Sequence, residues 1–201
     1  MVFFMPALKK NNSMSMPYKT LKIIFLIFTL TFSHNSSYAN TINIKSTHTY
    51  TENEIYYMDA FYDLELTEEA YRALRHGISF EIHAHFQLRL KREWLWDKTI
   101  SERKLIYKLE HKPLTESFLT IDLITGLRRS YDSLDAALNH ISSISRMTLF
   151  NNGLLNENKK YIARIRAFLD IESLPPPMRP QAYFSPNWDM SSKWYEWEVI
   201  R

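Results

Sequence analysis

Residues 78–91 alternate between apolar and polar side chains over their whole length, and no other feature of the chain constrains the fold as tightly. Successive side chains on a β-strand point to opposite faces, so this segment predicts a long strand with one apolar and one polar face. The apolar face would carry Ile78, Phe80, Ile82, Ala84, Phe86, Leu88 and Leu90. The polar face would carry Glu81, His83, His85, Gln87 and Arg89. Such a strand is typical of an antiparallel sheet that packs on one side only.

Six further segments have apolar residues in a strand pattern. They are residues 54–66, 100–110, 117–124, 127–131, 159–171 and 194–200. Three successive prolines at residues 175–177 cannot continue a hydrogen-bonded ladder. They predict an extended surface crossing before the last strand.

Two short helices are predicted between these strands. Thr67 precedes two glutamates, the pattern of an N-cap with acidic residues at the positive end of a helix, and Gly77 would end this helix. Asp132 would cap a second helix, whose apolar residues recur at spacings of three and four as far as Ile144 or Ser145. These elements predict a mainly β (α+β) fold, with a twisted antiparallel β-sheet in a two-layer sandwich rather than a barrel.

Residues 17–39 have the three parts of an export signal. Lys19 and Lys22 precede an apolar run at residues 23–32, and a small-x-small cleavage site follows at residues 37–39. The apolar run is about half of the ~20 residues that a membrane-spanning helix needs, which favours a cleaved signal peptide over a retained anchor.

The leader defines the expected organisation of the chain. We expect residues 1–39 to be this leader and residues 40–201 to form a single β-rich domain, located in the periplasm or secreted. An inner-membrane anchor formed by an uncleaved leader is the alternative, and the leader would then be the only contact with the membrane. Translation from Met14 or Met16 would give the signal a more typical length, so residues 1–13 are expected to be dispensable.

The charge of the chain argues against nucleic acid as a partner. The formal net charge is +3, but four lysines and no acidic residue precede residue 40, which leaves 21 basic and 22 acidic residues in the rest. Binding of nucleic acid needs a surface rich in basic residues, so this class is excluded. The chain contains no cysteine, which excludes disulfides, zinc–thiolate sites and thiol catalysis.

Three polar residues of the long strand form a candidate metal site. Glu81, His83 and His85 would share one face at two-residue spacing, which lets two imidazoles and one carboxylate bind a single metal ion. The alternative is the solvated side of an amphipathic strand, where any polar residue is acceptable. The alternative is favoured, because no further cluster of histidine or aspartate lies near these residues in the sequence.

Aromatic residues near the ends of the strands form a candidate binding surface, since flat aromatic rings beside polar groups stack on sugars and peptides. The candidate binding residues are Trp94, Trp96, Trp188, Asp189, Trp194, Tyr195 and Trp197. The alternative, which is favoured, is that the indoles fill the ends of the core. No catalytic residue is predicted: three glycines cannot supply a glycine-flanked serine, a phosphate loop or a dinucleotide fingerprint.

The end of the chain carries a distinctive motif, Trp-Asp-x-Ser-Ser-x-Trp-Tyr-x-Trp at residues 188–197. With Leu-Asp-Ile and Leu-Pro-Pro-Pro at residues 169–177, Leu-Thr-Glu at residues 66–68 and Trp-Leu-Trp-Asp at residues 94–97, it resembles the proteobacterial exported proteins grouped as domain of unknown function 4390. The resemblance covers roughly residues 50–198. The chain departs slightly from the family pattern at Glu93, where relatives have basic and aromatic residues.

The resemblance implies an exported, envelope-located domain and carries over no catalytic residue, since no activity is established for the family. Some relatives are encoded beside a membrane sensor kinase, which links the family to signalling by association only. We expect a non-catalytic binding or envelope accessory module without a cofactor, whose partner is an envelope protein or another cell-envelope component. The alternative is a metal-dependent hydrolase that acts on envelope material through Glu81, His83 and His85.

Overall fold

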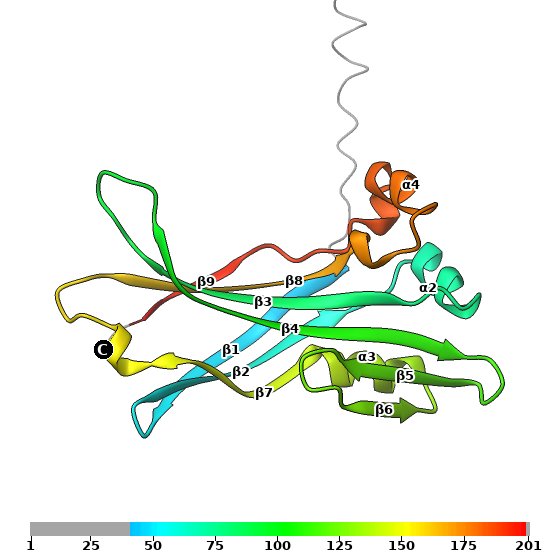
Figure 1. The fold of residues 1–201 in the computed structure, drawn as a ribbon, viewed down its shortest axis with the longest axis horizontal. Helices are drawn as coiled ribbons and strands as arrows, with labels where there is room; N and C mark the ends of the chain where they lie inside the picture. Colours follow the sequence, from blue (N-terminus) through cyan, green and yellow to red (C-terminus); the bar gives the residue numbers. More distant parts are fainter. Residues whose placement is uncertain (1–40, 200–201) are drawn as a thin grey trace, which may run out of the picture. The chain divides into compact units, whose positions relative to one another are not determined.

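The structure of the protein is a computed structural model that describes residues 41–199, and these residues belong to one compact unit. The predicted leader, residues 1–39, lies outside the described residues. The unit consists of two antiparallel sheets and three α-helices (Figure 1). Among the described helices, none has the length and apolar character needed to cross a membrane.

The smaller sheet has three strands in the order β1-β2-β7. They are β1 (Ile42–Glu52), β2 (Ile55–Leu64) and β7 (Ser143–Asn151). The larger sheet has six strands in the order β6-β5-β4-β3-β8-β9. They are β3 (Phe80–Leu90), β4 (Lys98–Lys112), β5 (Ser117–Asp122), β6 (Arg128–Tyr131), β8 (Tyr161–Asp170) and β9 (Tyr195–Val199).

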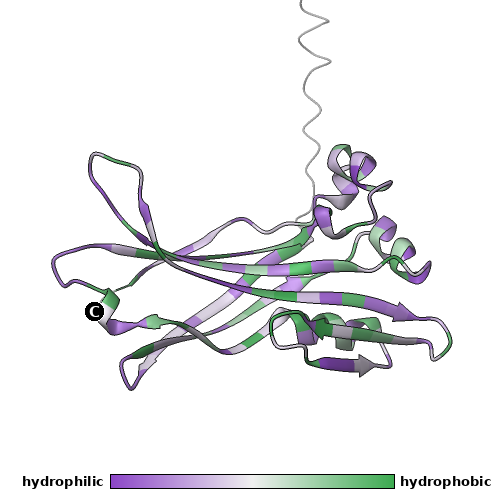
Figure 2. Ribbon diagram, viewed as in Figure 1, coloured by the Kyte–Doolittle hydropathy of each residue, from purple (hydrophilic) through white to green (hydrophobic). Residues whose placement is uncertain are grey.

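The predicted apolar face of the long strand is buried. Phe80, Ile82, Phe86 and Leu88 on β3 are inaccessible to solvent, and hydrophilic and hydrophobic residues alternate along the strand (Figure 2). Phe86 stacks on Phe150 of β7, with 6.5 Å between the ring centroids, so the two sheets meet through their apolar faces. The predicted mainly β (α+β) fold with two packed sheets is therefore confirmed.

Both predicted helices are present and pack against the sheets. In α2 (Glu68–Arg75), Thr67 is the predicted N-cap and accepts a hydrogen bond from the Ala70 amide at 3.2 Å. The second helix, α3 (Leu134–Ser142), packs against β2, β5 and β6, and the Tyr62 hydroxyl donates to the Ile141 carbonyl at 2.9 Å. Burial raises the pKa of this Tyr62 phenol, which stays a neutral donor.

Two details of α3 correct the sequence prediction. Its N-cap is Ser133 rather than Asp132, and its last residue is Ser142, so the predicted continuation to Ile144 or Ser145 is wrong. From Ser143 the chain forms β7, because pairing with β2 satisfies its backbone groups and buries Ile144. Neither β7 nor β1 was predicted.

The proline-rich crossing is also more structured than expected. It contains the short 3₁₀-helices η2 (Ile171–Ser173) and η3 (Pro186–Trp188) and a third α-helix, α4 (Arg179–Phe184). Pro180 lies in the first turn of α4, where a missing amide proton costs no helical hydrogen bond. A further 3₁₀-helix, η1 (Asn152–Leu154), follows β7.

Candidate functional site

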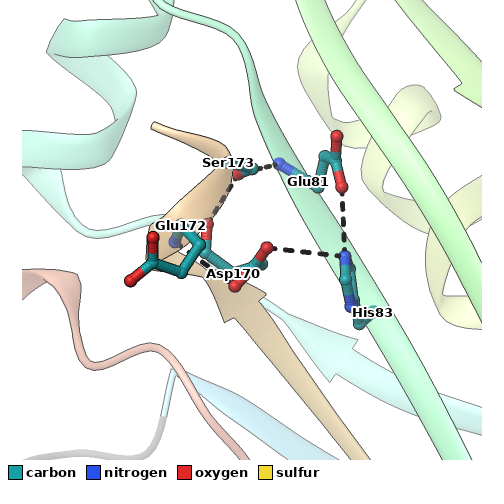
Figure 3. Close-up of polar contacts among 5 residues, drawn as sticks. All are labelled: Glu81, His83, Asp170, Glu172 and Ser173. Carbon is teal, nitrogen blue, oxygen red and sulfur yellow. Dashed lines mark hydrogen bonds and ion pairs between the residues drawn. The ribbon is translucent and has the colours of Figure 1, made fainter. Parts of the chain in front are cut away.

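The polar face of β3 meets β8 at a carboxylate–histidine cluster formed by Glu81, His83 and Asp170 (Figure 3). The Nε2 atom of His83 lies 3.2 Å from Oε2 of Glu81 and 4.0 Å from Oδ2 of Asp170. Side chains of the three residues are 15–28% exposed, so they are accessible without being fully solvated. One ligand atom from each residue lies within 4.8 Å of the other two, a spacing that could hold a divalent metal ion.

Strand register and a serine bridge position this cluster. Glu81 lies directly opposite Asp170 in the β3–β8 ladder, and alternation places His83 on the same face. The Ser173 hydroxyl donates to the Asp170 carbonyl at 2.6 Å and accepts from the Glu81 amide at 3.0 Å. The Asp170 carboxylate also accepts from the Glu172 amide at 3.3 Å, so both strand ends are held in place.

His85, the third residue of the predicted metal site, lies outside this cluster. Its Nε2 atom lies 2.8 Å from Oε1 of Glu102 on β4, and its ring lies 5.6 Å from that of Trp194. Burial lowers the pKa of His85, although the Glu102 carboxylate opposes this effect. The structure therefore groups Glu81 and His83 with Asp170, which the sequence analysis did not assign to the metal site because it lies about ninety positions further on.

Most of the candidate aromatic residues near the end of the chain are engaged in packing. Trp188 is 2% exposed, and its Nε1–H donates to Glu69 of α2 at 2.9 Å. Trp197 packs against the core beside Phe86, at 6.1 Å between ring centroids. The Arg164 guanidinium lies 4.0 Å from the centre of the Trp194 ring. Trp188 and Trp197 therefore pack in or against the core, and Trp194 contacts a basic side chain of β8.

Two other residues of the C-terminal motif are exposed. Tyr195 on β9 is exposed and lies 6.1 Å from the Trp197 ring. Asp189 accepts a hydrogen bond from the Ser191 hydroxyl at 3.2 Å. The remaining pair of candidate aromatics is Trp94 and Trp96.

That pair, Trp94 and Trp96, lies in the β3–β4 loop at residues 91–97, which we call the hairpin tip (Figure 1). The two side chains are 93% and 92% exposed, and Leu95 between them is also exposed. At the base of the tip, Arg89 lies 3.7 Å from the Asp97 carboxylate. The tip thus presents three large apolar side chains on a base fixed by an ion pair.

A second feature adjoins the hairpin tip. Lys91 and Arg92 line an open cleft of about 560 Å³ together with Lys159 and Lys160, which precede β8, and we call these four residues the cationic cleft. The Lys91 amide donates to the Lys160 carbonyl at 3.0 Å, so the two basic pairs are held side by side. Sequence analysis missed this cleft because its halves are nearly seventy residues apart and meet only through the β3–β8 pairing.

The fold and these sites define an antiparallel, two-sheet α+β domain with a polar cluster at one end of β3 and an exposed aromatic tip at the other. The model of the family described as domain of unknown function (DUF4390) matches residues 39–198, and the chain belongs to this family. The resemblance noted in the sequence is thereby confirmed. No curated protein matches the chain. No solved structure matches it either.

Proposed function

We propose that the chain is an exported accessory module of the cell envelope, which binds an envelope component through the hairpin tip without catalysing a reaction. The observation that carries the proposal is the nearly complete exposure of Trp94 and Trp96. Large aromatic side chains are seldom this exposed in a monomeric protein, and they are the residues that dominate binding energy at interfaces. The other tryptophans contribute to packing and do not compete for this role.

Export is supported by the signal pattern at residues 17–39 and by the compartment that the family resemblance implies. A binding role is supported by the geometry of the tip, whose apolar residues project from the sandwich instead of packing on it. Neighbouring apolar groups on a fixed loop lose little conformational freedom when they bind, which favours recognition.

Site-specific photocrosslinking in intact cells tests the proposal. A photoreactive phenylalanine derivative replaces Trp96 in the full chain, and a matched variant carries it at Leu114, a fully exposed residue in the β4–β5 turn. We expect a discrete envelope adduct from position 96 and several-fold less from position 114. Equal labelling at the two positions would contradict the proposed binding surface.

A second candidate function is divalent metal binding by the carboxylate–histidine cluster, which is what remains of the metal-dependent hydrolase hypothesis. Two carboxylates directly opposite each other on neighbouring strands repel, and a cation between them would remove this cost. One imidazole and two carboxylates are ligands that zinc and manganese accept.

Calorimetric titration of the full chain with zinc or manganese tests this second candidate. We expect binding that is lost in Asp170→Asn and retained in His85→Gln, because only Asp170 shares the cluster with His83. A dissociation constant in the high micromolar range or weaker would contradict the metal hypothesis. Loss of binding in His85→Gln with retention in Asp170→Asn would restore the metal site as predicted from the sequence.

A further inference from the structure

We propose that the hairpin tip docks on the surface of an anionic phospholipid bilayer, with its indoles at the level of the headgroups and the cationic cleft against the lipid phosphates. This inference rests on the proposed function and names the envelope component. It differs from the expectation that membrane contact is made through the leader alone. It assigns the contact to residues of the folded domain.

The composition of the tip fits the boundary between headgroups and acyl chains. Indole rings have a large apolar surface and one N–H donor, and they concentrate at membrane–water interfaces for this reason. Trp94 and Trp96 flank Leu95, and all three side chains are exposed. Three neighbouring apolar side chains on one loop can enter the interface together, whereas apolar residues scattered over a surface cannot.

The charges beside the tip complement an anionic surface. Lys91 and Arg92 are the first two residues of the tip, and they line a cleft of about 560 Å³ together with Lys159 and Lys160. Glu93 also lines this cleft, and Glu157 and Glu198 line an adjoining pocket that shares Lys159 and Lys160, so the four cations lie near three carboxylates. Basic residues outnumber acidic residues in the lining of this cleft, and the excess positive charge would attract lipid phosphates.

The tip and the cleft point to the same occupant. A free phosphate ion would use the cationic cleft and leave the indoles in water. An uncharged apolar partner would use the indoles and leave the cationic cleft in water. An anionic bilayer satisfies both features, because apolar insertion and attraction to anionic lipid add together at a membrane surface.

Fluorescence of a probe on the tip tests this proposal. The chain has no cysteine, so Leu95→Cys in the full chain accepts a single environment-sensitive nitrobenzoxadiazole label. The matched control is Leu114→Cys, which labels another exposed leucine, in the turn that follows the far end of β4. Both proteins are mixed with vesicles of phosphatidylethanolamine and phosphatidylglycerol, or of phosphatidylcholine alone. Any membrane insertion of residues 1–39 is common to both labelled proteins.

We expect the probe at position 95 to gain several-fold in intensity and shift to shorter wavelength with the anionic vesicles. We expect a smaller change with phosphatidylcholine and none at position 114. The double variant Lys159→Glu/Lys160→Glu should weaken the response to anionic vesicles, and high salt should do the same. Its control is Arg128→Glu/Arg129→Glu on β6, which changes the net charge equally at exposed positions. β6 pairs with β5, and β5 pairs with the half of β4 that is away from the tip.

Several outcomes overturn the inference. The probe at position 95 could stay in water with every vesicle, respond equally to both lipids, or respond no more than the probe at position 114. If the probe stays in water while crosslinking from position 96 captures a single envelope protein, the bilayer is excluded and the proposed binding function stands. If neither experiment gives a signal at the tip, both proposals fail.

Discussion

Glu81 and Asp170 lie directly opposite each other on β3 and β8, and the Nε2 atom of His83 lies within 4.0 Å of both carboxylates. Like charges at directly opposite positions destabilise a sheet, so these two carboxylates alone would lower the stability of the fold. A hydrogen bond from the His83 imidazole to either carboxylate, or a cation bound between the carboxylates, would offset this repulsion.

Asp170→Asn removes one of the two charges and keeps a side-chain oxygen for the Glu172 amide. In the presence of a chelator, we expect the free energy of unfolding to rise by about 0.5 kcal/mol, because the repulsion is relieved. Urea unfolding measures this, with Asp189→Asn at an exposed position as the control. A loss of more than about 1 kcal/mol would mean that the carboxylate makes a favourable contact which outweighs the repulsion.

Removal of the indoles at the hairpin tip should leave stability unchanged. In Trp94→Ala/Trp96→Ala we expect a change in the free energy of unfolding within about 0.5 kcal/mol, as for other exposed substitutions. Trp188→Phe should instead cost about 1–2 kcal/mol, since the Glu69 carboxylate loses a buried N–H donor. Thermal and urea unfolding of both variants separates the roles. A large loss in the tip variant would mean that these indoles pack in solution.

Acid should weaken the fold through His85 and His140. Burial is the main cause that lowers the pKa of each imidazole, and nearby Arg164 and Arg129, respectively, act in the same direction. The unfolded chain then takes up these protons at a higher pH than the folded chain. The resulting stabilisation is complete above the ordinary pKa of about 6.5 and is lost as the pH falls through the lower folded value.

Urea unfolding between about pH 5 and pH 7.5 tests this dependence on the two imidazoles. We expect His85→Gln to flatten the pH profile. In contrast, Glu102→Gln should lower the pKa of His85 further, because it removes the carboxylate that opposes the effect of burial on this pKa. The loss of stability should then continue to lower pH. An unchanged slope in His85→Gln would show that this imidazole does not titrate differently in the folded and unfolded chain.

Thr67 connects α2 to the distant C-terminal segment. Its hydroxyl caps the helix and donates to the Asn187 carbonyl at 2.8 Å. We expect Thr67→Ala to cost about 1–2 kcal/mol, because the cap and this link are lost together. Thr67→Ser keeps both hydrogen bonds and should cost far less. Chemical denaturation compares the two, and equal losses would point to the methyl group rather than the hydroxyl.

The elements that could be predicted are those whose signals are local. The alternation of apolar and polar residues along residues 78–91 fixes which face of β3 is buried, because successive side chains on a strand point to opposite faces. The N-cap of α2 at Thr67 is also found where the sequence predicts it, because its signal lies within the four consecutive residues 67–70. For β7, a helical spacing continues past Ser142 in the sequence, and pairing with β2 overrides it.

The candidate sites were less predictable because they depend on register between distant segments. No local signal connects Asp170 with His83, or Lys159 with Lys91, until β3 and β8 are paired. The exposure of Trp94 is a different case: a tryptophan near a strand end fits a buried plug as well as a free loop, and the sequence analysis favoured the plug. Only the position of the loop beyond the sandwich decides between them.

The β3–β8 ladder contains Glu81 paired with Asp170 at one end and Leu90 paired with Tyr161 at the other. The nine steps between these ten paired positions, at roughly 3.3 Å each, span about 30 Å. The ladder therefore fixes the distance between the carboxylate–histidine cluster and the base of the hairpin tip. With the tip on a bilayer, Glu81, His83 and Asp170 would lie at most about 30 Å further from the headgroups than the base of the tip, within reach of the extramembrane part of a neighbouring membrane protein.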